Sequence, residues 1–264
     1  MTTPSPSPHS LPERPDLRKL KDMAKAMVKD GSIETLSKAQ LAVARRYGFP
    51  SWPKLKSHVN TILFITACRS GDGSPEDFVD QFTDLEAKGP ANHTPLGSAT
   101  FHRQLNLACT LLDRGANPNA LYANDRSPLF GAVAGKNLEM MRLLLNRGAD
   151  VNLGIPKVGH TPLHRAASFE EPASAETLLS HGAAVNVQTI APNLDFPCFG
   201  GEVGEETAIH YAAGFGGLDV IRCLLEHGAT TNVRNKANKT PLDWALDQDR
   251  PPEVLALLRE ATAQ

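Results

Sequence analysis

Two short fragments recur at nearly fixed distances along most of this 264-residue chain. The first is Thr-Pro-Leu or a close variant, and it begins at Thr94, Ser127, Thr161, Thr207 and Thr240. The second is a Gly-Ala pair after leucines, and its glycine lies 21 residues after each of the first four starts. Successive starts are 33, 34, 46 and 33 residues apart. A unit of this length buries its apolar face only by stacking on its neighbours, so the chain is expected to form an array.

The sequence pattern of each repeating unit predicts two helices. The Thr or Ser hydroxyl can cap free backbone N–H groups at a helix start, and proline is tolerated in the first turn. Small residues such as Ala166 and Ala167 keep this first helix slim. A second helix carries apolar residues on one face, for example Leu138, Met141 and Leu145, and ends at a glycine suited to the left-handed conformation. The pattern therefore predicts an all-α fold.

This unit resembles the ankyrin repeat, whose signature is Thr-Pro-Leu-His-x-Ala. The resemblance extends from about Ile62 to the C-terminus. It implies an ankyrin-repeat solenoid of five to six repeats within residues 61–264, joined by β-turn fingers. Residues 61–88 are expected to form a degenerate opening repeat. The last repeat begins at Thr240 and closes without Gly-Ala, as expected of a cap with a polar outer face.

The N-terminal part differs in composition from the repeats. Residues 1–15 are rich in proline and serine and are expected to form a disordered tail. Residues 16–60 are predicted to form a basic helical module. Between positions 13 and 60, eleven Lys or Arg residues accompany five Asp or Glu residues, whereas the rest of the chain carries a net charge of −8.

Gly48-Phe49 and Ser51-Trp52-Pro53 resemble a small helical module at the head of many bacterial ankyrin-repeat proteins. Helices are expected over residues 17–28, from Ser37, and from a cap at Ser51. The module is expected to cap the array, because the first apolar face of a solenoid needs cover. Phe49, Trp52 and Leu55 are the residues expected to bury against residues 62–65.

Composition argues against several classes of partner. Aromatic residues beside Lys and Arg could stack on bases, but the acidic remainder would repel phosphate, so a nucleic-acid partner is not expected. Apolar stretches such as residues 62–65 are far shorter than a membrane span. Residues 1–12 lack the charge and apolar run of a secretory signal. Four cysteines without zinc or CxxC spacing favour a reduced, cytoplasmic protein.

The 46-residue spacing indicates an insertion at residues 187–203. Its apolar residues include Phe196 and Phe199, which is unusual for a loop. The insertion is either a functional loop or a flap that packs on the groove. Cys198 is a conceivable nucleophile, although a lone cysteine in such a loop is more often inert.

The histidines have structural explanations in the repeat pattern. His164 and His210 stand at the fourth signature position and are expected to tie neighbouring turns together. His181 and His227 precede capping glycines, where an imidazole suits a helix C-terminus. His93 and His160 each stand just before a repeat Thr, at least one repeat apart, which is too far for the two to share a metal. We therefore expect no catalytic residue, no metal and no cofactor.

The resemblance implies binding, because fingertips and the ends of first helices line a concave surface in ankyrin-repeat proteins. These positions are expected to be exposed, and three of them are phenylalanines that either anchor a partner or pack under the insertion. Together with two residues of the insertion, the predicted partner-binding residues are His93, Phe101, His102, Arg126, His160, Phe169, Phe196, Phe199, Glu206, Phe215 and Lys239.

The sequence thus favours a non-enzymatic scaffold that binds another protein along its concave face and fingers. The alternative is a small-molecule binder or an enzyme, built from the loop at residues 186–206 over the groove.

Overall fold

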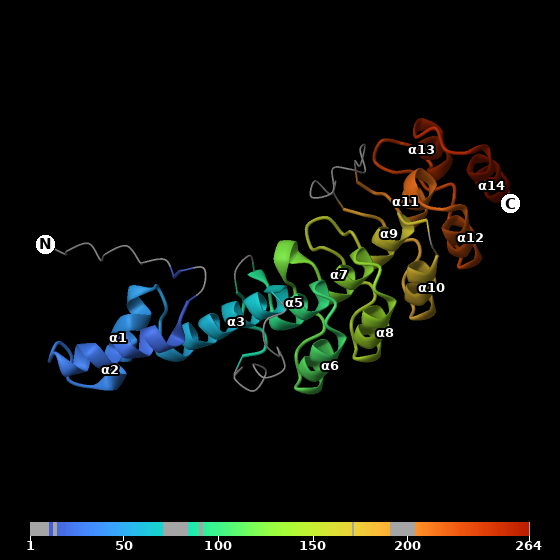
Figure 1. Ribbon diagram of the computed structural model, residues 1–264. Coiled ribbons are helices and arrows are strands. Elements are labelled where there is room, and N and C mark those ends of the chain that lie inside the picture. Colours follow the sequence, from blue (N-terminus) through green and yellow to red (C-terminus); the bar gives the residue numbers. More distant parts are fainter. Residues whose placement is uncertain are drawn as a thin grey trace, which may run out of the picture. The chain divides into compact units, whose positions relative to one another are not determined.

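The computed structural model describes residues 11–12, 15–70, 84–89, 92–170, 172–190 and 204–263. The fold is all-α, as predicted (Figure 1). Contacts between residues divide the chain into two compact units, residues 1–117 and residues 118–264. Within the described ranges, no helix is long and apolar enough to cross a membrane.

The first unit begins with three helices, α1 (Leu17–Lys29), α2 (Leu36–Arg46) and α3 (Trp52–Ser70). The Asp16 carboxylate caps α1 by accepting a hydrogen bond from the backbone N–H of Arg18 at 2.8 Å. Thr35 caps α2, so this helix begins one residue before the predicted start at Ser37. Capping by short polar side chains explains where both helices begin.

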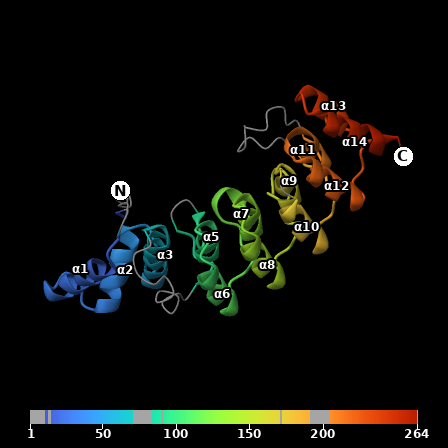
Figure 2. The same cartoon turned by 45° about the vertical axis from the view of Figure 1, so that its right-hand side comes forward.

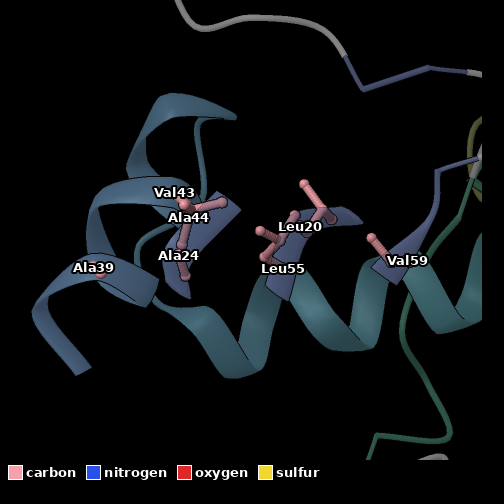
Figure 3. Close-up of a cluster of buried hydrophobic side chains, with 7 residues drawn as sticks. All are labelled: Leu20, Ala24, Ala39, Val43, Ala44, Leu55 and Val59. Carbon is pink, nitrogen blue, oxygen red and sulfur yellow. The ribbon is translucent and has the colours of Figure 1, made fainter. Parts of the chain in front are cut away.

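A small apolar core joins these three helices (Figure 3). Its buried residues, contributed by all three helices, are Leu20, Ala24, Ala39, Val43, Ala44, Leu55 and Val59. Four lysines of α1 stay exposed, as expected of a solvated face: Lys19, Lys21, Lys25 and Lys29. Phe49 and Trp52 are partly buried against this same core. Leu63, one of residues 62–65, packs against the same core, and a direct contact of these aromatics with that segment stays a prediction.

Helix α3 is continuous through residues 60 and 61, where the module was expected to end. Its C-terminal half contains the segment expected as the first helix of the opening repeat, and Phe64 there is fully buried. No glycine or proline interrupts the chain between Lys54 and Ala67. Since nothing breaks the helix, one element spans the end of the module and the start of the segment that was expected to open the repeats.

The first unit ends with one complete repeat pair, α5 (Pro95–Phe101) and α6 (Leu105–Asp113). Helix α5 packs on α3. The Glu86 carboxylate accepts a hydrogen bond from the backbone N–H of Asn117 at 2.8 Å. This contact joins residues 84–89 to the end of the first complete repeat.

The second unit stacks four helix pairs, whose first and second helices form two adjacent rows (Figures 1 and 2). The first helices are α7 (Pro128–Ala134), α9 (Pro162–Ala167), α11 (Ala208–Phe215) and α13 (Pro241–Asp247). The second helices are α8 (Leu138–Asn146), α10 (Ala173–Ser180), α12 (Leu218–Glu226) and α14 (Pro252–Thr262). A 3-10 turn, η2 (Ala123–Asp125), precedes α7.

The predicted helix starts and ends are confirmed. The Ser127 hydroxyl accepts from the N–H of Phe130 at 3.2 Å, and Thr94 and Thr240 make the same kind of cap. Gly148 and Gly182 end their helices at φ angles of 82° and 86°. A side chain would be strained in that left-handed conformation, which explains the recurring glycine.

An asparagine ladder, formed by Asn119, Asn152 and Asn186, ties successive repeats together. Each side chain accepts a hydrogen bond from a backbone N–H of the next repeat, at 2.8 to 2.9 Å. Each also donates to the carbonyl of the next repeat's capping glycine, at 3.0 to 3.5 Å. These asparagines lie four residues after the preceding glycine, a regularity that our sequence analysis missed.

Candidate partner-binding surfaces

Each finger is closed at its base by an equivalent backbone hydrogen bond, and this base is called the stem below. In the ordinary fingers, a backbone N–H donates to the carbonyl four residues later, immediately before the repeat Thr or Ser. These stem bonds are Gly89 to His93 at 2.8 Å, Tyr122 to Arg126 at 2.9 Å and Asn235 to Lys239 at 3.0 Å. The stem therefore fixes three predicted partner-binding residues, His93, Arg126 and Lys239, at the base of their fingers.

The insertion is a lengthened finger on the same stem. The N–H of Thr189 donates to the carbonyl of Glu206 at 2.8 Å, and Glu206 immediately precedes the repeat residue Thr207. Residues 190–205 thus replace the short tip of an ordinary finger. The N–H of Ile190 donates to the carbonyl of Val158 at 2.7 Å, which joins the lengthened finger to the preceding one.

Glu206 is fully buried, although its position was expected to be exposed. Its carboxylate accepts from the Thr189 hydroxyl at 2.7 Å and from the N–H of Gly204 at 3.0 Å. A buried carboxylate needs such donors, and these occupy both of its oxygens. Phe196, Phe199 and Cys198 lie outside the described residues.

Phe101 is the most exposed aromatic among the predicted residues, with 64% of its surface accessible. It ends α5, whose other residues are buried. The ring centroid lies 5.1 Å from that of His102 and 6.1 Å from that of His93, and both rings meet it edge-on. The structure therefore brings three predicted residues together in the first unit.

His160 is 1% exposed, which corrects the expectation that this position faces solvent. Its stem is one residue longer than the others, because the N–H of Ile155 donates to the His160 carbonyl five residues later. The ring packs among Tyr211 at 5.0 Å, His164 at 5.4 Å and Phe130 at 5.8 Å between centroids. The extra finger residue accounts for the 34-residue spacing.

Phe169 and Phe215 are also less exposed than expected. Phe169 is buried, and its ring lies 4.7 Å from the Lys136 ammonium and 5.0 Å from the Arg165 guanidinium. Phe215 is half-buried, 6.0 Å from the Trp244 ring. Lys136 and Arg165 contact the Phe169 ring and Trp244 contacts the Phe215 ring, and spacing alone does not show these contacts. Their role in binding stays a prediction.

The signature histidines tie turns together, as predicted. Nδ1 of His164 accepts from the N–H of Thr161 at 3.1 Å, which leaves Nε2–H to donate to the Val187 carbonyl at 3.0 Å. His210 repeats this arrangement with Thr207 and the Lys239 carbonyl. Burial lowers the pKa of His164 to about 4 and lowers the pKa of His210 as well. Both imidazoles are therefore neutral structural links at neutral pH.

His181 and His227 lie at helix C-termini, as predicted. Nδ1 of His181 donates to the Thr177 carbonyl at 2.7 Å, and Nδ1 of His227 donates to the Cys223 carbonyl at 2.8 Å. Burial raises the pKa of the Cys223 thiol. In the part of the chain that the structure describes, no three His, Cys, Asp or Glu side chains are grouped as metal ligands would be.

The first unit also contains a small pocket of about 200 Å³ between α3 and residues 84–88. Phe49 and His58 form one wall, with ring centroids 4.9 Å apart. Lys54 and Asp84 form an exposed ion pair at 3.6 Å on another wall. The size of this pocket suits only a small group.

A family model described as ankyrin repeats, in three copies, matches residues 96–189 and 194–264, more than half of the chain. The chain therefore belongs to the ankyrin-repeat family. The match begins at residue 96, so it includes the second unit and the complete repeat of the first, while α1 to α3 precede it.

Several curated proteins are similar to the repeats. Delta-latroinsectotoxin-Lt1a of Latrodectus tredecimguttatus is 34% identical over 127 residues, covering 46% of this chain and 10% of the toxin. An ankyrin repeat protein of Rickettsia felis is 33% identical over 124 residues, covering 44% of this chain and 54% of its own length. The human transient receptor potential cation channel subfamily A member 1 is 39% identical over 92 residues, covering 34% of this chain and 8% of the channel. The chain thus spans at most about half the length of these relatives.

Proposed function

We propose that this chain is a non-enzymatic ankyrin-repeat scaffold that binds another protein in the cytoplasm through finger stems and the ends of its first helices. The observation that carries the proposal is the exposure of Phe101. A large aromatic side chain that the core does not use is a candidate anchor at an interface. Its flanking residues, His93 and His102, place two imidazole rings beside it.

The alternative, a ligand site or enzyme at residues 186–206, has less support, because the polar groups of the described stem bond to one another. Both carboxylate oxygens of Glu206 are occupied in closing the stem. Thr189, the other polar group there, is buried and uses its hydroxyl in the same contact. The stem therefore supplies hydrogen bonds that hold the loop, and Phe101 remains the better-supported binding feature.

A photo-crosslinking experiment tests the proposal. Replacing Phe101 by benzoyl-phenylalanine in the host cell should give covalent adducts with a discrete protein partner on irradiation. Phe101→Ala should weaken recovery of that partner by about tenfold or more, the loss typical of an interface anchor, without changing the unfolding temperature. Leu36→Ala is the matched control, since Leu36 is also exposed but lies at the start of α2. Equal recovery by Phe101→Ala and wild-type protein would refute the proposal.

A further inference from the structure

A cluster of three cations, Arg126, Lys136 and Arg165, lies on the second unit and is called the basic cluster below. Lys136 and Arg165 contact the same ring, Phe169, at 4.7 Å and 5.0 Å. The Arg126 guanidinium lies 6.0 Å from the ring of Phe130. The His160 ring connects these two groups, because it lies 5.8 Å from the Phe130 ring and 5.4 Å from the ring of His164, the residue before Arg165.

The three cations of the cluster lie against the rings of two buried phenylalanines, Phe130 and Phe169. Lys136 is exposed and both arginines are partly exposed, whereas Phe130 and Phe169 are buried beneath them. Stacking on a ring holds a cation in place and lowers the entropy lost when it binds an anion. Lys136 forms no ion pair with any described residue. The arrangement resembles a preformed surface for carboxylates more than a flexible solvated face.

We propose that the basic cluster docks an acidic segment of a partner protein, with glutamate or aspartate side chains contacting Arg126, Lys136 and Arg165. This inference rests on the proposed function, since it names the chemistry of a protein partner. It concerns a surface of the second unit, whereas Phe101 belongs to the first.

The charge distribution favours a short acidic segment over a long polyanion. Residues 118–264 contain 12 Lys or Arg and 17 Asp or Glu, so this unit carries a net charge of −5. A nucleic-acid backbone extending beyond the cluster would meet more of that negative surface than a short acidic segment would. Two exposed carboxylates, Asp125 and Glu170, adjoin the cluster in sequence, and neither pairs with another described residue.

His160 does not alter the charge of the cluster near neutral pH. Burial is the main cause that lowers its pKa well below the ordinary value, and His164, Arg165 and Arg126 lower it further. The imidazole therefore stays neutral near neutral pH. Binding to the cluster should accordingly be insensitive to pH between about 6 and 8.

The test measures the fluorescence anisotropy of a labelled peptide in which glutamates alternate with leucine and serine, against a matched peptide with glutamine in place of glutamate. The full chain should bind the glutamate peptide more tightly, and less so as salt increases. Lys136→Gln should weaken binding by about threefold, the effect of one partly exposed charge, and Arg165→Gln should weaken it by about tenfold. Lys236→Gln removes an exposed charge from another finger of the same unit and should change nothing.

Three results would overturn the inference: equal binding of the two peptides, equal losses in Lys136→Gln and Lys236→Gln, or tighter binding of a single-stranded oligonucleotide that depends on Lys136. Thermal unfolding of each variant shows whether a lost signal reflects lost folding. Should the glutamate peptide fail to bind while Phe101 crosslinking still captures a partner, the inference fails and the proposed function stands. The reverse pair of results would refute the role of Phe101 as an anchor and support the basic cluster.

Discussion

Thr189 and Glu206 join the two ends of the lengthened finger through three hydrogen bonds. The Thr189 N–H donates to the Glu206 carbonyl, the Glu206 N–H donates to the Thr189 hydroxyl at 3.0 Å, and that hydroxyl donates to the Glu206 carboxylate. Two residues separated by 17 positions thus form the same closed base as residues four apart in the ordinary fingers.

Glu206→Ala should destabilise the second unit by about 2–3 kcal/mol, because it leaves the buried Thr189 hydroxyl and the Gly204 N–H without their acceptor. Chemical denaturation with urea measures this loss. Glu205→Ala is the control, because that side chain is exposed in the adjacent position. A loss of less than about 0.5 kcal/mol in Glu206→Ala would show that the stem does not depend on the carboxylate.

Replacing residues 191–203 with a short turn should leave the fold intact, because the stem from Thr189 and Ile190 to Gly204, Glu205 and Glu206 remains. Repeat proteins tolerate length changes in fingers for this reason. The free energy of unfolding should stay within about 0.5 kcal/mol of the wild-type value. A second deletion that also removes Thr189 and Glu206 should be clearly less stable, and equal stability of the two deletions would contradict the role given to the stem.

Acidification should destabilise the protein through its buried histidines. The pKa of His164 is about 4 in the folded state and 6.5 in an ordinary environment, because burial disfavours the charged ring. The unfolded chain therefore binds more protons, so stability is complete above pH 6.5 and falls as the pH decreases toward 4. The loss from His164 alone is on the order of 3 kcal/mol.

Urea midpoints measured from pH 8 to pH 4 check this expectation. His164→Gln should be less stable at pH 8 and should lose less stability on acidification, since the variant lacks the proton-binding group. A pH dependence unchanged by the substitution would assign the effect to other groups, such as His160 and His210, whose pKa values burial also lowers.

Asn152→Ala should cost about 1–3 kcal/mol, because the substitution removes one acceptor and one donor between successive repeats. Asn232 is the matched control: it lies four residues after Gly228, is exposed, and has no asparagine-ladder contact among the described residues. Thermal unfolding of the two variants compares the ladder with its terminal position. Similar losses would show that the contacts between repeats do not carry this energy.

The repeat helices could be predicted because their signals are local. A capping hydroxyl at Thr94 and a left-handed glycine at Gly148 act within a few residues of themselves. The asparagine ladder also left a sequence signal, since Asn119, Asn152 and Asn186 keep a fixed distance from their glycines.

The surfaces could be predicted only in part. Exposure of Phe101 followed from its repeat position, but the burial of His160 and Glu206 depends on contacts with residues distant in sequence. Lys136 and Arg165 are 29 residues apart and meet only through the Phe169 ring. Continuity of α3 was missed because the family resemblance suggested a boundary where the chain contains no helix-breaking residue.

The unbroken α3 sets the rotational phase between the N-terminal module and the repeat that follows in the first unit. Each residue of an α-helix advances the chain by about 1.5 Å and turns it by about 100°. One residue added between Val59 and Ile62 would therefore rotate the faces of α1 and α2 by more than a quarter turn relative to α5. The number of residues in α3 therefore determines which face of the module lies on the same side of the first unit as Phe101.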